Sequence, residues 1–269
     1  MIGFTTWYNM YIMKAYSINC YERRREMLMY DVHGHMGKTS SGDPVDAHAL
    51  VKDMDKYGIA KIGISSLSGT VNRVQNDLVY ECYKEYPDRI LPYAFINPKA
   101  PDAHEEIDLC LGERGFKAVK FHSWKHGYYA DNTPQLDEIL THIEKYGVHV
   151  QTHVGTSPLS TPFVWMRLAK KHPNINFLFT HMGCREFGYS VIEAVRDIPN
   201  IYLETSVIYD TDVLLKVKEC VGAKRIVFGT DWPYKSVECE IEKIYQMGFT
   251  DEELEYVFHK NAAHLWSME

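Results

Sequence analysis

The sequence lacks several patterns that would place it in a specialised class of protein. Its 269 residues include six cysteines, but no Cys-x-x-Cys pair, which argues against a disulfide framework or a structural zinc site and favours free thiols in a reducing cytoplasm. Positive charge is not in excess: the formal net charge is −7 and the pI is near 6.0. This balance argues against nucleic acid or an acidic membrane surface as a partner. What is left is an ordinary globular chain that can bury a sizeable core.

Long linkers, low-complexity segments and internal repeats of 20–50 residues are also missing, so the length suits a single domain. Only the N-terminus stands apart. Residues 1–13 are fairly apolar, and three arginines follow at positions 23–25. A secretory leader carries its positive charges before the apolar stretch, and this stretch is too short to span a membrane. We therefore expect an N-terminal extension over residues 1–27, one domain over residues 28–269, and no membrane role.

Short β-branched and aromatic runs alternate with longer stretches of helical period along that domain. Asp43-Pro44 is typical of a helix start, and Thr250 with Glu253 forms a capping box that opens one extra C-terminal helix. Eight repeats of strand and helix, with nearly continuous apolar strands, predict a parallel sheet that closes into a (β/α)8 barrel. The expected strands are residues 28–33, 61–65, 90–96, 116–122, 148–153, 176–181, 201–205 and 225–230.

An open, doubly wound sheet is the alternative architecture. It would ordinarily have a glycine-rich phosphate loop after its first strand. Here the first strand runs into His33-Gly34-His35-Met36-Gly37, which is not such a loop. The barrel is therefore the favoured interpretation.

Histidine and aspartate stand at the ends of four expected strands. His33 and His35 follow the first, His153 the fifth, His181 the sixth and Asp231 the eighth. Carboxyl ends of parallel barrel strands meet at one mouth, where active sites lie, so these side chains should converge. Imidazole and carboxylate are the ligands of a catalytic divalent metal that keeps one position open for water. Singly, each has an ordinary explanation: a hydrogen-bonded core histidine, or an aspartate that caps the following turn.

Residues that alternate along a strand point to the same face of the sheet. If the histidine-bearing faces point into the barrel mouth, further polar groups join the cavity, while Val119, Phe121, Val150 and Thr152 face the helices. The polar sets that share a face are Asp31, His33 and His35; Lys120 and His122; Gln151 and His153.

Loops after the strands are where substrate specificity should lie. Trp124, Arg185 and their neighbours suggest a small, partly apolar or aromatic substrate with an anionic group. Glu204 is harder to place: it either orients a neighbouring polar group or faces a helix. The residues expected to contact the substrate are Asn97, Lys120, His122, Trp124, Arg185 and Trp232, with Lys125 and Lys235 nearby.

These motifs together resemble the amidohydrolase superfamily, in the amidohydrolase-related branch that includes aminocarboxymuconate-semialdehyde decarboxylase. The matching features are His33-x-His35, the strand-end His153 and His181, the turn at residues 229–233 and the late Asn261-Ala262-Ala263. The resemblance spans residues 28–265. It implies a (β/α)8 barrel with one divalent metal, commonly zinc.

By the same resemblance, the metal ligands would be His33, His35, His153 and Asp231, and His181 would be a nearby acid or base. Binuclear members bridge two metals with a carboxylated lysine from the fourth strand, where this chain has Lys120. The alternative for Lys120 is an ammonium that pairs with Asp31 or with a substrate anion.

The expected activity is metal-dependent hydrolysis. Metal-activated water would attack an amide, ester or lactone carbonyl of a small, anionic substrate, with Asp231 and His181 as catalytic groups that move protons. The alternative is a decarboxylase of a small unsaturated or aromatic acid, because both reactions use the same ligands. A phosphoesterase barrel and a barrel that only binds a ligand are the other rivals. Self-association into a homo-oligomer is left open.

Overall fold

The computed structural model describes residues 27–39, 41–66 and 69–268. The expected N-terminal extension lies outside these residues, apart from Met27. Within the described ranges the strands form one sheet in the order β2-β1-β3-β4-β5-β6-β7-β8-β9. They are β1 (Met29–Lys38), β2 (Pro44–Val45), β3 (Ile59–Ser66), β4 (Ile90–Phe95), β5 (Ala118–Phe121), β6 (His149–Thr152), β7 (Phe177–Phe179), β8 (Ile201–Glu204) and β9 (Ile226–Val227).

Backbone hydrogen bonds close this sheet into a barrel. All neighbouring strands from β1 through β3 to β9 pair in parallel. The Val32 amide then donates to the Phe228 carbonyl at 3.1 Å, and the His35 amide donates to the Trp232 carbonyl at 2.8 Å. Gly34 and Trp232 also form a parallel bridge. The predicted (β/α)8 barrel is therefore confirmed, with all eight expected strands in place.

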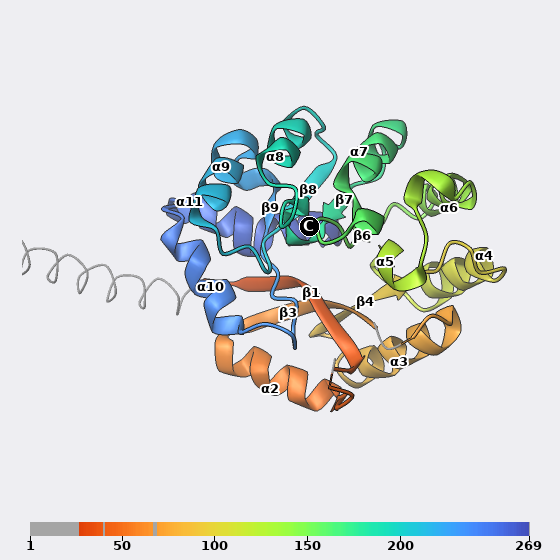
Figure 1. The fold of residues 1–269 in the computed structure, drawn as a ribbon. Coiled ribbons are helices and arrows are strands. Elements are labelled where there is room, and N and C mark those ends of the chain that lie inside the picture. Colours follow the sequence, from red (N-terminus) through yellow and green to blue (C-terminus); the bar gives the residue numbers. More distant parts are fainter. Residues whose placement is uncertain (1–26, 40, 67–68, 269) are drawn as a thin grey trace, which may run out of the picture.

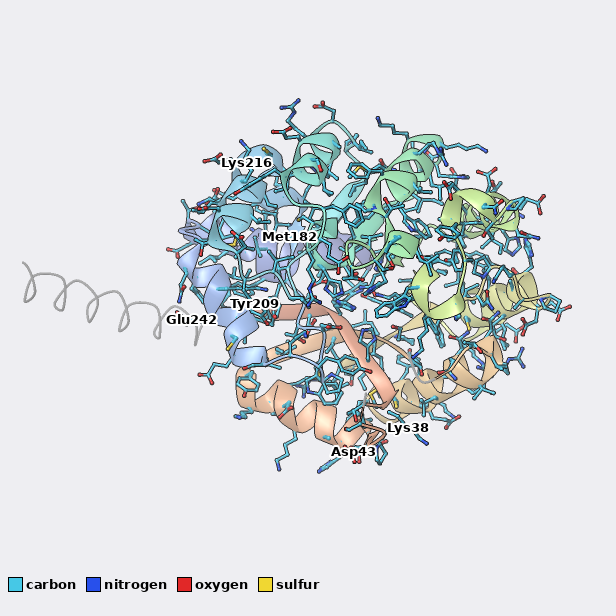
Figure 2. The ribbon with its side chains drawn as sticks, viewed as in Figure 1. Lys38, Asp43, Met182, Tyr209, Lys216 and Glu242 are labelled. Carbon is cyan, nitrogen blue, oxygen red and sulfur yellow. The ribbon has the colours of Figure 1, made fainter. Side chains whose placement is uncertain are left out.

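The first strand is longer than the sequence suggested. β1 continues past His33 to Lys38 and pairs in antiparallel with β2, which was not expected. His33 therefore lies within β1 rather than at its end, because pairing with β3 extends to Met36 opposite Ser66. Lys38 and Asp43, on this added corner, lie together at one edge of the molecule (Figure 2).

Helices surround the ring of strands (Figure 1). Besides short 3₁₀ turns, they are α2 (Ala47–Tyr57), α3 (Asn72–Glu85), α4 (Ala103–Ile107), the π-helical η1 (Asp108–Glu113), α5 (Ser123–His126), α6 (Gln135–Glu144), α7 (Pro162–Lys171), α8 (Tyr189–Arg196), α9 (Thr211–Val221), α10 (Val237–Gln246), α11 (Asp251–Glu255), the π-helical η6 (Tyr256–Lys260) and α12 (Asn261–Leu265).

Capping side chains explain where several helices begin. Thr250 and Glu253 form the expected capping box at the start of α11. The start predicted from Asp43-Pro44 is wrong: these residues are part of the β1–β2 corner, and α2 begins three residues later. Asp46 caps that helix, because its carboxylate accepts the Ala49 amide at 2.7 Å.

Two apolar layers lie on opposite faces of the strands. Val119, Phe121 and Val150 pack between barrel and helices, as alternation predicts. Inside the barrel, Val32, Tyr93 and Leu178 form a second cluster with Leu265 and Trp266 of the C-terminal segment. Because the Trp266 indole donates to the Tyr93 hydroxyl at 2.7 Å, the C-terminal segment closes one end of the barrel, and the C-terminus lies at the centre of the ring (Figure 1). The other end stays open for a site.

Among the residues that the structure describes, no helix combines the length and the apolar character that a membrane crossing requires. The five cysteines in this part of the chain are all free thiols.

Candidate metal centre and active site

A cavity of about 570 Å³ opens at the carboxyl ends of the strands. The barrel closure described above brings side chains from β1 and from the turn after β9 together with those that follow β5, β6 and β7. Most of the residues predicted for the site line this cavity: His35, His122, Trp124, His153, His181, Arg185 and Asp231.

Three of the predicted metal ligands form a tight group at the base of the cavity. The Nε2 atoms of His33 and His35 are 3.1 Å apart. Asp231 Oδ1 lies 3.2 Å from His35 Nε2 and 3.7 Å from His33 Nε2. Both imidazoles are buried, and the Asp231 side chain is 13% exposed. The three donor atoms are therefore close enough to share one cation.

Hydrogen bonds on the far side of each ring assign the tautomers. His33 Nδ1 lies 2.8 Å from the Glu204 carboxylate, and His35 Nδ1 lies 3.4 Å from the Ser65 carbonyl. A carboxylate and a carbonyl only accept, and the Ser65 hydroxyl, 3.2 Å from His35 Nδ1, can accept as well. Each Nδ1 therefore carries the proton and donates it. Both Nε2 lone pairs then point at each other and at a carboxylate oxygen. Three acceptors that converge in this way fit a bound cation.

Burial keeps these groups in the protonation states that bind a metal. Burial lowers the pKa of His35, and burial with the nearby Lys120 charge lowers the pKa of His33 well below its usual range. Burial alone would raise the pKa of Asp231, but the adjacent imidazoles of His35, His33 and His181 hold it below its usual range. Neutral imidazoles beside a carboxylate are the forms that ligate metals.

The two other histidines predicted for the site, His181 and His153, lie around this group. His181 Nδ1 is 3.0 Å from the Ser206 hydroxyl, and its ring centre is 5.3 Å from that of His33. His153, the fourth predicted ligand, lies farther out. Its Nε2 is 2.6 Å from the Thr156 hydroxyl, and its ring stacks on His122 with centres 3.9 Å apart. His153 thus faces the cavity without joining the tight group.

Lys120 is fully buried beside the group formed by His33, His35 and Asp231 rather than beside Asp31. Its Nζ lies 3.3 Å from His33 Nε2, and burial lowers its pKa to about 7. Asp31 instead accepts the His33 amide at 2.9 Å and the amide and hydroxyl of Thr230 at 3.1 and 2.5 Å. Of the alternatives considered for Lys120, the pairing with Asp31 is therefore not present.

The Asp31 contacts hold the turn that carries Asp231. Asp231 has a φ of 57°, a left-handed conformation that aspartate tolerates better than most residues. Gly229 precedes it, and a Cβ atom there would overlap the Glu204 carboxylate. The Gly229-Thr230-Asp231 turn thus combines a glycine that makes room for Glu204 with an aspartate that tolerates the bend.

Besides Lys120, two predicted substrate contacts lie away from the cavity lining. The Asn97 side chain accepts the Lys99 amide at 3.2 Å, and the Trp232 indole is buried and donates to Asp53 at 2.9 Å. Sequence reasoning missed Tyr234, Thr156 and Val207, which line the cavity, because loop residues carry no periodicity that marks their direction.

Glu204 is the most informative residue that the sequence left open. It is fully buried and accepts hydrogen bonds from His33 Nδ1, the His181 amide and the Ser206 hydroxyl at 2.8, 3.1 and 2.9 Å. Its position at the end of β8, on the inward face, was the available clue. Glu204 therefore orients neighbouring polar groups and does not face a helix.

The amidohydrolase family model matches residues 30–268, nearly all of the described chain. The chain belongs to the amidohydrolase family. The resemblance drawn from the histidine and aspartate motifs is thereby confirmed.

The chain is similar to enzymes whose names give their activities. The chain is 22% identical to gamma-resorcylate decarboxylase of a Rhizobium species over 72% of this chain and 76% of that protein. It shares the fold of 2,6-dihydroxybenzoate decarboxylase from Rhizobium, with a TM-score of 0.76, 19% identity and coverage of 90% of this chain and 99% of that one. A dihydroxybenzoic acid decarboxylase from Polaromonas, with bound manganese and the inhibitor 2-nitroresorcinol, gives a TM-score of 0.74 at 18% identity, covering 90% and 97% of the two chains.

These relatives correct the predicted activity. The expectation of a hydrolase is wrong by this comparison, because the curated relative is a decarboxylase, which was the alternative. The same ligand set serves both reactions, so the motifs alone did not separate them. The expectation of a divalent metal fits a possible site in this chain and the manganese of a solved neighbour, but neither specifies zinc.

Proposed function

We propose that this amidohydrolase is a metal-dependent decarboxylase of a small aromatic carboxylic acid. The observation that carries the proposal is the convergence of the His33 and His35 lone pairs with the Asp231 carboxylate at the base of an open cavity. The decarboxylase relatives support the reaction type. A bound divalent cation would neutralise negative charge on the substrate's carboxylate and on an adjacent oxygen.

Within the chain, His33, His35 and Asp231 would hold that ion, with His153 as the fourth ligand predicted from the family resemblance. Imidazole nitrogens and a carboxylate suit zinc as well as manganese, so the proposal is one divalent cation of either kind. Glu204 and Ser65 orient the two imidazoles through their Nδ1 atoms, and such partners raise metal affinity.

Besides holding the metal, the protein must supply a proton to the substrate. Decarboxylation breaks the bond between the ring carbon and the carboxylate carbon, releases carbon dioxide and leaves an electron pair that must take up a proton. His181 and Asp231 both line the cavity, and we assign proton delivery to this pair. Ser206 fixes the His181 ring through Nδ1, which leaves Nε2 for the exchange.

The cavity walls fit an aromatic acid. The Trp124 and His153 ring centres are 6.2 Å apart, and those of Tyr234 and His35 are 5.8 Å apart, so aromatic rings flank the cavity on two sides. Lys125, Arg185 and Lys235 also line it, and within the described chain none of them forms an ion pair. Three cationic side chains beside a metal site favour an anionic substrate.

The test is reconstitution followed by a substrate panel. Metal-free protein is loaded with Mn²⁺ or Zn²⁺, metal content is measured, and carbon dioxide release is followed with hydroxybenzoates such as 2,6-dihydroxybenzoate. We expect release that depends on one equivalent of metal. A fully loaded protein that releases no carbon dioxide from any hydroxylated aromatic acid would contradict the proposal.

A further inference from the structure

The loop after β8 joins the active site to helix α10. Along it, Ser206 and Val207 are buried, and Val207 lines the cavity. Val207 has a φ of 71°. A β-branched residue is strained in this left-handed region and stays there only when its surroundings hold it.

Ser206 is the contact between this loop and the histidines. Its hydroxyl lies 3.0 Å from His181 Nδ1 and 3.3 Å from His33 Nδ1, and it donates to Glu204 at 2.9 Å. The position of Ser206 therefore decides the orientation of the His181 ring. Because Val207 is the next residue, its backbone conformation sets where Ser206 lies.

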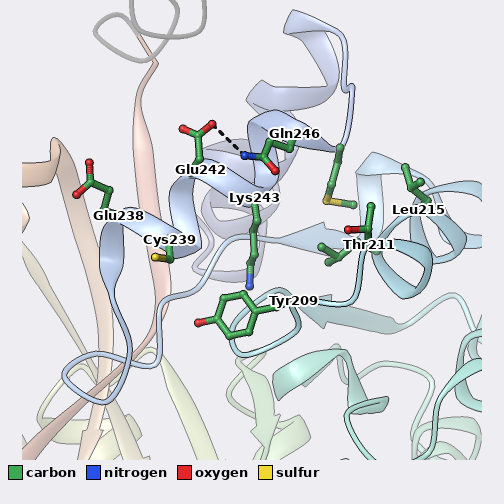
Figure 3. A pocket seen from close by; sticks show the side chains of 10 residues that line it. Tyr209, Thr211, Leu215, Glu238, Cys239, Glu242, Lys243 and Gln246 are labelled. Carbon is green, nitrogen blue, oxygen red and sulfur yellow. Dashed lines mark hydrogen bonds between the residues drawn. The ribbon is translucent and has the colours of Figure 1, made fainter. Parts of the chain in front are cut away.

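A buried ion pair on α10 binds the other side of the loop. Glu240 is fully buried and accepts the Val207 amide at 3.1 Å and the Tyr209 hydroxyl. Lys243 is 8% exposed, pairs with Glu240 and donates to the Thr205 carbonyl at 2.6 Å. The Lys243 ammonium also points at the Tyr209 ring, 4.8 Å from its centre (Figure 3).

The Glu240–Lys243 pair thus binds every second residue of the loop: Thr205, Val207 and Tyr209. Ser206 lies between the first two of them. A buried ion pair is a poor source of stability, because desolvation offsets most of the attraction, but removal of one partner leaves an uncompensated charge. Its three contacts to one short loop indicate a role in fixing conformation.

We propose that Glu240 and Lys243 are positioning residues for catalysis. They hold Val207 in its left-handed conformation, so that Ser206 faces His181 and the Val207 side chain forms part of the cavity wall. The catalytic part of this inference rests on the proposed decarboxylase function. The loop-holding part rests only on the contacts described.

The experiment replaces both charges together, since Glu240→Leu with Lys243→Met keeps apolar bulk and leaves no unpaired charge. The matched control is Glu219→Leu with Lys216→Met on α9. That pair has the same i,i+3 spacing, but its side chains are 72% and 39% exposed. If the double variant does not fold, Glu240→Gln with Lys243→Met keeps an acceptor for the Val207 amide and leaves no unpaired charge.

Two readouts separate loop holding from catalysis. Hydrogen–deuterium exchange over residues 205–209 should rise at least tenfold in the α10 variant and stay unchanged in the α9 control. The kcat should fall roughly ten- to a hundredfold, with metal content and KM near the wild-type values. Adding Val207→Asn, which tolerates a positive φ and keeps a side chain at the cavity wall, should restore much of the lost kcat.

Unchanged exchange in the α10 variant would overturn the proposal. Raised exchange with unchanged kcat, or a kcat loss that Val207→Asn does not reduce, would overturn the positioning role and leave a structural one. If the wild-type protein turns over no aromatic acid, the proposed function fails, and the exchange experiment still decides whether α10 holds the loop.

Discussion

His33, His35 and Asp231 bring two neutral imidazoles and one carboxylate to a single point. In this arrangement their Nε2 and Oδ1 atoms, 3.1 to 3.7 Å apart, are all acceptors. Such a set is unfavourable unless a cation or a proton lies between its members. The ability of this site to bind a cation therefore depends on the orientation of each side chain as much as on its residue type.

We predict that His33→Ala and Asp231→Asn each lower metal affinity by at least tenfold while the barrel stays folded. Asparagine tolerates the left-handed conformation at position 231, so the second change removes charge and little else. Metal titration and circular dichroism check this outcome. His126→Gln is the control, since His126 is buried but lies outside the donor group. A variant with full affinity would refute the assignment.

His181 should act on protons and not hold the metal. His181→Asn keeps a residue that accepts the positive φ of 56°. We expect kcat to fall by roughly a hundredfold to ten-thousandfold, the range for loss of a general acid or base, with metal content near normal. Steady-state kinetics and metal analysis measure both quantities. Loss of the metal together with kcat would make His181 a ligand instead.

At the scale of elements, strand β6 links the site to the closed end of the barrel. His153 follows its carboxyl end, whereas His149 begins it, fully buried against the C-terminal segment. His149 Nδ1 lies 3.1 Å from the Leu265 carbonyl, and Tyr93 meets its ring edge-on, with centres 5.2 Å apart. Burial lowers the pKa of His149 to about 4.

The burial of His149 predicts that the folded protein loses stability in acid. The unfolded chain binds a proton at His149 below pH 6.5, whereas the folded chain does not until about pH 4. The contribution to stability is thus fully present above pH 6.5 and is lost as pH falls from 6.5 to 4, on the order of 3 kcal/mol. In urea unfolding at pH 7 and 4.5, the free energy of unfolding of His149→Gln should depend less on pH than that of the wild-type protein.

The comparison variant is His48→Gln, which removes an exposed histidine from α2. Between pH 4.5 and 7, the free energy of unfolding of this variant should depend on pH as it does in the wild-type protein. Equal pH dependence in wild type and His149→Gln would show that other groups account for the acid sensitivity.

On the scale of the whole molecule, charge is distributed unevenly. The chain carries a formal net charge of −7, yet Lys125, Arg185 and Lys235 line the cavity. These cations come from α5 and from the loops after β7 and β9, so only the closed barrel brings them together. A local field of this sign concentrates anionic ligands at the mouth.

For an anionic substrate, Arg185→Leu should raise KM about two- to fivefold, the effect of one solvent-exposed charge pair of up to about 1 kcal/mol. The effect should shrink at high salt, since exposed charges are screened. Lys52→Met, on the exposed face of α2, is the control and should leave KM unchanged. If the increase in KM of Arg185→Leu does not depend on salt concentration, the shape of the Arg185 side chain and not its charge affects substrate binding.

The linear sequence determined the barrel and the three groups that converge as candidate metal donors. Strand alternation, the His33-x-His35 pair and Asp231 in its turn are local patterns, and parallel topology places all strand ends at one mouth. Only the tertiary structure decided the rest. Glu204, Ser206, Glu240 and Lys243 act through partners far along the chain, and Trp232 turns away from the cavity toward Asp53. Such contacts depend on where loops and helices meet after folding, which the period of one strand or helix does not encode.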